Sequence, residues 1–272
     1  MDLSVVVPAY REGPRIYDNL RHLLAELDQL KLSYEVLVVS DGNADATAAE
    51  AERVGSPHVT VLHYEVNMGK GYALAYGVRH SRGELVTFID ADMELHPREI
   101  KRFIAMMDER NLDIVIGSKR HPESVVAYPL FRRLQSATYQ LLIRLLFNLR
   151  VRDTQTGLKL FRRKVLLDTV PLLAVKQFAF DLELLVVAHH LGYQRIAEAP
   201  IQLQYQFEST VRPLAVYQIL WDTAAIFYRL HILKYYDRRR GPVDDGAGGA
   251  NQAAPPALAE TTAVIPADAP PG

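Results

Sequence analysis

Short apolar runs alternate with helical patterns through the first half of the chain, and this alternation restricts the fold more than any other feature. Runs rich in valine, isoleucine and leucine occupy residues 3–10, 34–42, 58–66, 84–92 and 112–119. Helical patterns lie between the first four of them, at residues 15–30, 44–55 and 71–83. Apolar strands separated by helices are typical of a mostly parallel sheet covered by helices on both faces. We therefore predict an α/β fold with a mostly parallel central sheet flanked by helices.

The last segment of the chain differs from the rest in composition. Residues 241–272 contain six of the fifteen prolines and no aromatic residue. Segments of this kind bury too little apolar surface to fold, so we predict a disordered tail. The preceding 237 or so residues belong to a chain that is 49% hydrophobic overall, which is enough for one substantial core.

Charge and cysteine content exclude several classes of function. The net charge of −1 gives no overall attraction to nucleic acid, so we expect no nucleic-acid partner. The absence of cysteine excludes disulfides, thiolate catalysis and zinc–thiolate sites, and it suits a reducing compartment. The first ten residues lack the basic start of a signal peptide, and no uncharged apolar run reaches the length of a spanning helix. We expect a cytoplasmic protein that does not span a membrane.

Polar side chains follow each of the first four apolar runs. In chain order they are Tyr10 and Glu12, then Asp41, then Asn67 and Lys70, and then Asp90 and Asp92. Ligands of parallel sheets bind beyond the carboxyl ends of the strands, so these residues predict one shared binding site.

The Asp-Ala-Asp sequence at the end of the fourth run is the strongest candidate for chemistry. In an extended segment Asp90 and Asp92 point to the same side, and their carboxylates suit Mg²⁺ or Mn²⁺ together with substrate phosphates. Glu94 continues the alternation as a possible third ligand. The alternative is a solvated turn, in which Glu94 is an ordinary loop residue.

Other nucleotide and hydrolase motifs do not fit. The sequence "NMGKGYALAYG" lacks the spacing of a P-loop, and "AYREGPR" stands where a dinucleotide-binding fold has its glycine-rich turn. The same "PAYREGPR" argues against a nucleotidylyltransferase, which needs a glycine-rich turn there. The chain contains neither HExxH nor GxSxG.

Four segments, "SVVVPAYRE", "YEVLVVSDGNADAT", "NMGKGYALAYG" and "FIDADMEL", resemble in this order the nucleotide-sugar half of family 2 glycosyltransferases of the GT-A fold. The resemblance implies that Asp90 and Asp92 hold a divalent cation against the diphosphate of the donor. One departure is Ser40, which stands where the family usually has an aspartate. The implied donor-binding residues are Pro8, Tyr10, Glu12, Asp41, Lys70, Asp90 and Ala91.

The second half of the chain is locally basic. Residues 119–164 contain eleven lysines and arginines but only two acidic residues, Glu123 and Asp153. Part of this charge forms a solvated face. The excess of positive over negative residues would also bind a phosphate-bearing acceptor or an anionic membrane surface. Residues 134–149 and 213–233 form amphipathic, nearly unbroken apolar patterns, which fit either core helices or helices that lie in a bilayer interface.

Four further segments, "GSKRHPES", "RDTQTGLKLFRR", "FAFDLELLVVAHHLGY" and "ESTVRPL", resemble the branch of the family that makes polyprenyl-phosphate-linked sugars. They are similar to dolichyl-phosphate β-glucosyltransferases and, less closely, to dolichyl-phosphate mannose synthases. The resemblance covers residues 2 to about 237 and implies a nucleotide-sugar half (1–118) and an acceptor half (119–237). It implies a UDP-glucose donor, with GDP-mannose as the alternative, and a polyprenyl-phosphate acceptor. Attachment would be peripheral or through a partner, at the cytoplasmic face of a membrane.

A phosphate acceptor also explains the basic residues. A phosphate monoester has a second pKa near 6, so it is already largely an anion at neutral pH and needs little help from a general base. We select Lys119, Arg120, Lys159 and Arg212 as its partners, with Arg120 and Arg212 preferred for their forked guanidinium groups. Asp181 lies where other family members keep a catalytic carboxylate; we expect a supporting role or a buried ion pair. The proposed catalytic set is Asp92, Arg120, Arg212 and Asp181.

Two rival functions remain open at this point. The first keeps the fold but transfers the sugar to a hydroxyl group of a saccharide or glycolipid, for which Asp181 would have to act as the base. The second is a membrane-surface module that binds without catalysis. The intact pair of Asp90 and Asp92 argues against this second rival.

Overall fold

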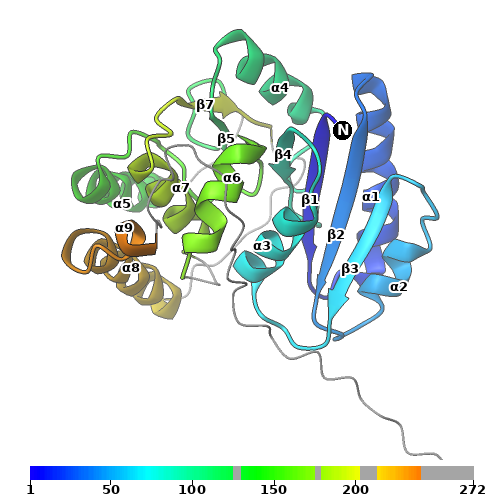
Figure 1. The fold of residues 1–272 in the computed structure, drawn as a ribbon, viewed down its shortest axis with the longest axis horizontal. Helices are drawn as coiled ribbons and strands as arrows, with labels where there is room; N and C mark the ends of the chain where they lie inside the picture. Colours follow the sequence, from blue (N-terminus) through cyan, green and yellow to red (C-terminus); the bar gives the residue numbers. More distant parts are fainter. Residues whose placement is uncertain (125–129, 175–178, 203–212, 240–272) are drawn as a thin grey trace, which may run out of the picture. The chain divides into compact units, whose positions relative to one another are not determined.

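The computed structural model of the chain describes residues 1–124, 130–174, 179–202 and 213–239. Within these ranges one sheet of seven strands has the order β3-β2-β1-β4-β6-β5-β7 (Figure 1). β6 runs antiparallel to both of its neighbours, and the other pairs are parallel, which confirms the predicted mostly parallel sheet. The strands are β1 (Leu3–Ala9), β2 (Tyr34–Asp41), β3 (Val59–Tyr64), β4 (Leu85–Phe88), β5 (Ile114–Ser118), β6 (Lys159–Arg162) and β7 (Ile196–Pro200).

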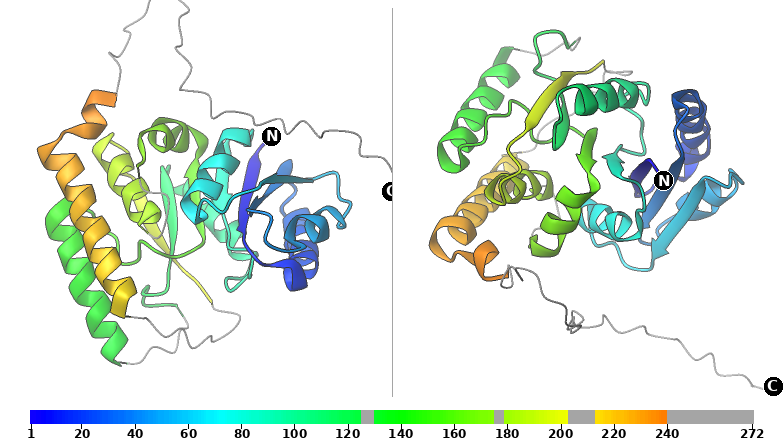
Figure 2. Two further views of the ribbon diagram at one scale, coloured as in Figure 1. Left: turned by 90° about the horizontal axis from the view of Figure 1, so that it is seen from below. Right: turned by 45° about the horizontal axis from the view of Figure 1, so that its top comes forward.

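Helices cover both faces of the sheet, as predicted (Figures 1 and 2). One face is packed by α1 (Gly13–Leu27), α2 (Thr47–Glu52) and α4 (Glu99–Glu109). The other is packed by α3 (Lys70–His80), α6 (Arg163–Thr169) and α7 (Phe180–His190), and the same core includes residues of α5 (Leu130–Phe147) and α8 (Pro213–Phe227). A π-helical turn (Tyr228–Ile232) and α9 (Tyr235–Arg239) follow α8. Two short 3₁₀ turns cover Asp28–Leu30 and Val170–Leu172.

The two cores follow from the alternation of side chains along each strand. In β1, Val5 and Val7 lie in the core beneath α1, whereas Val6 lies in the core beneath α3. In β2, Val36 and Val38 join the first core, and the intervening Leu37 joins the second. Both faces are buried, which is why these strands read as continuous apolar runs and not as alternating ones.

One sequence prediction about the fourth strand is wrong. The strand ends at Phe88, and the residues from Asp90 to Met93 form a turn in which the Met93 N–H donates to the Asp90 carbonyl at 3.0 Å. The two aspartates therefore do not alternate along an extended segment. The hydrogen-bonded pairing with β6 covers only residues 85–88. Beyond it the tendency of aspartate to form turns determines the conformation of the backbone.

Residues Met1–Arg239 form one compact unit. Residues 240–272 lie outside the described part of the chain, so the disordered tail remains a prediction, as do the boundaries of the two halves. Among the described helices none is long and apolar enough to cross a bilayer.

A buried carboxylate ties the strands together at the amino end of the sheet. Glu35 of β2 is 3% exposed and accepts hydrogen bonds from the Ser4 hydroxyl (2.6 Å), the Arg82 backbone N–H (2.7 Å) and the Arg82 guanidinium (2.7 and 2.9 Å). Burial raises the pKa of the Glu35 carboxyl, but the bonds from Ser4 and Arg82 outweigh burial, and the net shift is downward. The ionised form is thus favoured by folding.

We expect Glu35→Gln to lower the free energy of unfolding at pH 7 by about 1–3 kcal/mol, because it weakens several charge-assisted hydrogen bonds in a buried place. Since folding lowers the pKa of Glu35 below its ordinary value of 4.5, the difference from wild type should persist down to that pH and shrink as the pH falls further. Urea unfolding at several pH values measures it. The same change at the exposed Glu109 should have little effect, and a pH-independent loss in Glu35→Gln would contradict the assignment.

Candidate active site

A cavity of about 670 Å³ opens at the carboxyl ends of β1, β2 and β4. It brings together the polar residues that the sequence placed after the first four strands, so the predicted clustering is confirmed. The lining residues are Pro8, Ala9, Tyr10, Glu12, Asp41, Asn67, Gly69, Lys70, Gly71, Asp90, Ala91, Asp92, Gln155, Phe180, Asp181 and Ile219.

Asp41 fixes one wall of the cavity through its carboxylate. The side chain is 3% exposed and accepts hydrogen bonds from the backbone N–H groups of Met68 (2.7 Å) and Gly69 (2.9 Å) and from the Tyr64 hydroxyl (2.9 Å). Gly69 has a φ of +91°, a conformation that glycine adopts without strain. Asp41 thus holds the loop that starts α3 and sets the position of Lys70.

Lys70 and Asp90 form an ion pair inside the cavity, with 2.5 Å between Nζ and Oδ1. Burial lowers the pKa of the Lys70 ammonium, but the nearby carboxylates of Asp90, Asp181 and Asp92 outweigh burial and raise it. Lys70 is therefore a cation at neutral pH. Both side chains remain more than a third exposed, so a ligand can reach the pair.

The turn that carries Asp90 and Asp92 is held from two sides. The Asn19 side chain of α1 donates to the Ala91 carbonyl at 2.8 Å. On the other side Gly157 approaches so closely that a Cβ there would lie 2.0 Å from Oδ2 of Asp90, so any larger residue would displace this carboxylate. The backbone of the loop before β6 therefore packs directly against a carboxylate of the site.

The donor set on this wall fits a divalent cation. Asp90 and Asp92 both line this cavity, and hard oxygen ligands such as carboxylates are what Mg²⁺ and Mn²⁺ prefer. Glu94, the third predicted ligand, does not line the cavity; its carboxylate accepts from Lys119 Nζ at 2.9 and 3.1 Å. Asp90 and Asp92 are the residues that would hold the ion.

Comparison with known proteins identifies the family. Residues 4–169 match the family model "Glycosyl transferase family 2". The chain belongs to this family. It is 34% identical over 253 residues to dolichyl-phosphate beta-glucosyltransferase ALG5A of Trichomonas vaginalis, a match that covers 87% of this chain and 77% of that protein. It is 36% identical over 207 residues to dolichyl-phosphate beta-glucosyltransferase of Drosophila melanogaster, covering 70% and 64% of the two chains. The resemblance drawn from the sequence motifs is thereby confirmed.

Solved structures agree with this assignment at the level of the fold. Mannosyl-3-phosphoglycerate synthase from Rubrobacter xylanophilus superposes with a TM-score of 0.66 at 17% identity, covering 91% of this chain and 79% of that one. Glucosyl-3-phosphoglycerate synthase from Mycobacterium tuberculosis, solved with Mn²⁺, UDP-glucose and phosphoglyceric acid, gives 0.61 at 19% identity, covering 83% and 79%. The predicted GT-A fold is confirmed.

In this family 2 enzyme the predicted partners of the acceptor phosphate do not gather in the cavity. Lys159 is 1% exposed, and its ammonium donates to Oδ1 of Asp181 (2.7 Å) and to the Thr156 carbonyl (2.5 Å). Lys119 is paired with Glu94, and the Arg120 guanidinium donates to the Arg152 carbonyl at 3.4 Å.

Arg212 lies outside the described residues. Of the side chains that the structure does describe, Lys70 is the basic one on the cavity wall. The roles assigned to the other basic residues stay predictions. Asp181, in contrast, does line the cavity, with Lys159 packed behind it.

Six lining residues were missed by sequence reasoning, namely Ala9, Gly69, Gly71, Gln155, Phe180 and Ile219. Gln155 and Phe180 lie in segments that the family resemblance had already marked, "DTQTG" and "FAFDLELL", so a signal for them existed. Phe180 packs against Gly71, where a Cβ would lie only 2.7 Å from the ring. Ile219 reaches the cavity from α8, far along the sequence, and only the packing of that helix reveals it.

Replacing Asp41 by Asn should loosen residues 67–70 without unfolding the enzyme. The amide of asparagine offers one acceptor oxygen instead of two, so the N–H of Met68 or Gly69 loses its partner, at a cost of about 1–3 kcal/mol. We expect hydrogen exchange at the amide that loses its partner to become about 5- to 150-fold faster, since each 1.4 kcal/mol is a factor of ten.

Tyr64→Phe is the matched control, because it removes a bond to the same carboxylate and leaves both backbone bonds in place. Exchange at Met68 and Gly69 should be unchanged in this control. Slow exchange in both variants would show that Asp41 does not hold the loop.

Proposed function

We propose that this family 2 glycosyltransferase moves a hexose from a nucleotide sugar to a polyprenyl or dolichyl phosphate, with UDP-glucose as the donor and with inversion at the anomeric carbon. The observation that carries the proposal is the cavity in which Asp90, Asp92 and Lys70 face a single space. Its specificity rests on the relatives, which are named dolichyl-phosphate beta-glucosyltransferases at 31–36% identity.

The donor half of the reaction concerns the diphosphate that leaves. Asp90 and Asp92 are the residues that would hold Mg²⁺ or Mn²⁺, and such an ion, when bound, supplies positive charge next to the leaving diphosphate. Lys70 adds an ammonium group on the same wall and is already attracted to that region by Asp90. Pro8, Tyr10 and Glu12 lie at the end of β1, in the part of the cavity that remains for the nucleoside.

The acceptor half concerns how a phosphate oxygen reaches the sugar. That oxygen forms the new bond to the anomeric carbon on the side opposite the diphosphate, whose oxygen keeps the electron pair of the broken bond. Because the phosphate is already largely an anion, no side chain has to take a proton from it. Asp181 then serves to position this wall, since Lys159 already binds its Oδ1. This ion pair favours a phosphate acceptor over a hydroxyl acceptor, which would need a base.

We expect Asp92→Asn to lower hexosyl transfer by at least about 100-fold, the scale seen when one electrostatic contact to developing charge is removed. Excess EDTA should have a similar effect on wild type. The assay uses purified protein, dolichyl or undecaprenyl phosphate, Mn²⁺ and a panel of labelled UDP- and GDP-sugars, with labelled lipid as the readout. The same panel separates UDP-glucose from GDP-mannose.

Asp18→Asn is the control, since Asp18 is exposed on α1 and the chemical change is the same. Its activity should match wild type. Undiminished transfer in Asp92→Asn, or in wild type with EDTA, would refute the role given to the acidic pair.

We further propose that the enzyme docks on a membrane surface through the outer face of α5 and α8. The two helices pack side by side, with the Tyr139 hydroxyl 2.9 Å from that of Thr223 and the rings of Phe147 and Phe227 in contact (Figure 2). Their outer side chains are large, apolar and more than 40% exposed, namely Leu141, Leu145, Tyr217, Leu220 and Trp221. Trp and Tyr favour the boundary between lipid and water.

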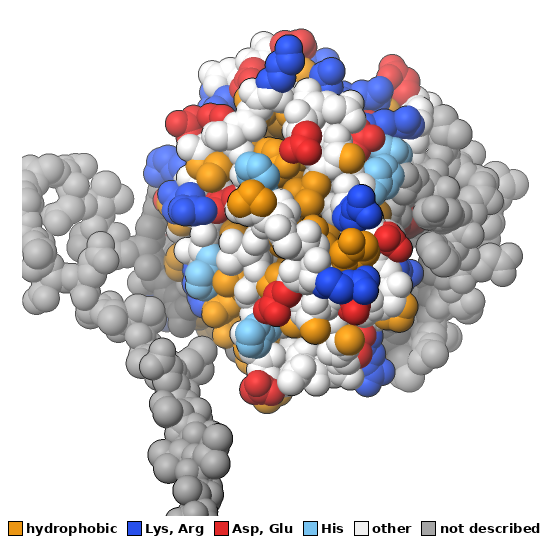
Figure 3. Space-filling model, turned by 90° about the vertical axis from the view of Figure 1, so that its right-hand side faces the viewer, with side chains coloured by type: hydrophobic (Ala, Val, Ile, Leu, Met, Phe, Trp, Pro, Cys, Tyr) orange, Lys and Arg blue, Asp and Glu red, His pale blue; other side chains and the backbone are white. Residues whose placement is uncertain are grey.

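Charge and position support the same partner. Arg144 and Arg150 are exposed at the end of α5, where an anionic lipid surface attracts them. The opposite side of α8 reaches the cavity through Ile219, so a lipid-linked phosphate would enter along the helix that faces the membrane. On the face over β3, α1 and α2, acidic, basic and apolar side chains are interspersed (Figure 3).

The double change Leu145→Glu with Trp221→Glu should weaken binding to vesicles of phosphatidylcholine and phosphatidylserine at least about tenfold. Each wild-type side chain contributes up to roughly 1.5–3 kcal/mol when fully buried, and 1.4 kcal/mol is a factor of ten. Flotation with vesicles measures the bound fraction. Leu167→Glu is the control, because Leu167 is also exposed but lies on α6. Equal binding by all three proteins would exclude α5 and α8 as the docking face.

A further inference from the structure

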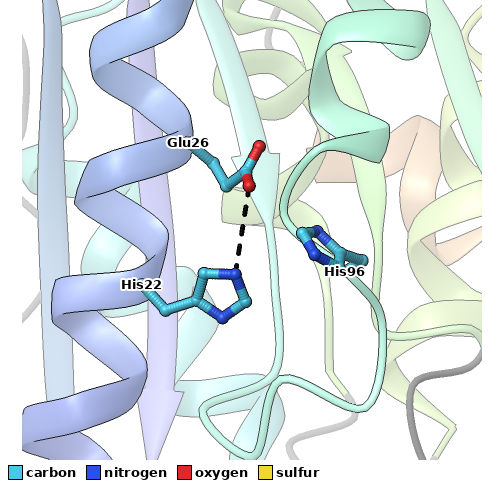
Figure 4. A group of neighbouring side chains, drawn as sticks. All are labelled: His22, Glu26 and His96. Atoms are coloured by element: carbon cyan, nitrogen blue, oxygen red, sulfur yellow. Dashed lines mark ion pairs between the residues drawn. The ribbon is translucent and has the colours of Figure 1, made fainter.

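Three side chains outside the cavity converge in a way that the glycosyl transfer does not use. His22 and Glu26 are one turn apart on α1, and His96 lies in the loop between β4 and α4 (Figure 4). One ligand atom from each lies within 4.8 Å of the other two. In the part of the chain that the structure describes, this is the single group of three such residues with this spacing.

No hydrogen bond joins these three side chains to one another. His22 Nε2 and Glu26 Oε1 are 3.9 Å apart, too far for a hydrogen bond, and the two imidazole rings meet edge to face with centroids 4.9 Å apart. Tetrahedral ligands of a zinc ion lie about 3.4 Å from one another, given metal–ligand bonds of about 2.1 Å. A small inward movement of the side chains would therefore complete a three-ligand site.

We propose that His22, Glu26 and His96 bind a transition-metal cation, Zn²⁺ before others, at a site separate from Asp90 and Asp92. Two imidazoles and one carboxylate form a set that suits Zn²⁺, whereas Mg²⁺ and Mn²⁺ prefer oxygen ligands alone. The three residues are partly exposed, so the ion has a path from solvent and the fourth position is left to water.

The surroundings of His96 are compatible with this role. The guanidinium of the neighbouring Arg98 donates a hydrogen bond to Oε1 of Gln202 (2.5 Å), and its Nε lies 4.0 Å from Oε1 of Glu99. Its positive charge is thus paired with Glu99. The Arg98 backbone N–H donates to Nδ1 of His96 at 3.2 Å. If His96 coordinates the ion through Nδ1, the metal replaces this hydrogen bond. If it coordinates through Nε2, the ring proton moves to Nδ1, which then can no longer accept the hydrogen bond from Arg98. Either way the cost is one long hydrogen bond.

The site would fasten the loop that carries the acidic pair. Asn19, His22 and Glu26 fall on one stripe of α1, at spacings of three and four residues. Asn19 already holds the carbonyl of Ala91, and His96 follows Asp92 by four residues. A cation bound to His22, Glu26 and His96 would attach the far end of this loop to the same helix. Its effect is structural and needs no sugar substrate.

The test uses the full chain, stripped of metal with EDTA and then dialysed. We expect one equivalent of Zn²⁺ to bind in equilibrium dialysis, and the Tm to rise by about 5 °C or more when free Zn²⁺ is about 100 times its Kd. Exchange of the amides in residues 93–98 should slow as well. In His22→Gln and in His96→Gln the affinity for Zn²⁺ should fall at least about tenfold. Replacing a residue that only supports a metal ligand already costs about that much, and these changes remove a ligand itself.

His63→Gln and Asp92→Asn are the controls. The chain has nine histidines, and His63 is an exposed one on β3. Its replacement tests whether the loss of any surface histidine lowers Zn²⁺ binding. Asp92→Asn tests separation from the donor site and should keep the Zn²⁺ response. Equal Zn²⁺ binding in wild type and His96→Gln would overturn the proposal, as would a loss in Asp92→Asn or His63→Gln as large as in His96→Gln. None of these readouts depends on glycosyl transfer, so this site and the proposed function can fail independently.

Discussion

The parallel pairing of β1 with β2 on one side and β4 on the other is the constraint on which the site depends. In this register Ala9 lies beside Ser40, and Val6 lies beside Phe88, so the three strands end near one another. Tyr10 follows β1, Asp41 is the last residue of β2 and Asp90 lies two residues beyond β4, and all three line one cavity. The opposite edge of the same strands carries Glu35, whose acidic charge is fully engaged by Ser4 and Arg82. The carboxylates of Glu35 and Asp41 are both buried and hydrogen-bonded, whereas that of Asp90 remains accessible from the cavity.

The sequence was sufficient for the first five strands and for most of the cavity wall, because both depend on local patterns, but it predicted neither β6 nor β7. Apolar runs locate strands, and the polar residues after them must share an edge if the strands are parallel. The sequence was not sufficient where tertiary packing decides which partner a side chain has. Lys159 reads as one of many basic residues, and only the fold shows it buried behind Asp181. Lys119 likewise gives no sign in sequence of its partner Glu94, because the two come from different loops.

Two lysine–carboxylate pairs include a residue of the cavity wall, and their difference in exposure matters for chemistry. The pair of Lys159 and Asp181 has its ammonium buried, and a backbone carbonyl also binds that ammonium. Opening it would leave a charge without solvent, which is costly, so this pair is part of the wall. The pair of Lys70 and Asp90 is more than a third exposed on both sides. Water and ligands compete with such a contact, so Lys70 is the cation that a phosphate group can draw away from its partner.

Helix α1 connects the features that surround the acidic turn. The Glu12 backbone N–H, just before the helix, donates to the Thr47 hydroxyl, and the Gly13 backbone N–H, at its first residue, donates to the Asp45 carboxylate. These bonds connect the cavity end of β1 to the segment after β2. Nearly two turns further along, Asn19 holds Ala91, which lies between the two aspartates. His22 and Glu26 then face His96 at the end of the same loop. Because α1 buries Ile16, Leu20 and Leu23 against the sheet, it is a rigid support. A loop that carries two mutually repelling carboxylates needs such a support, since no regular strand holds it beyond Phe88.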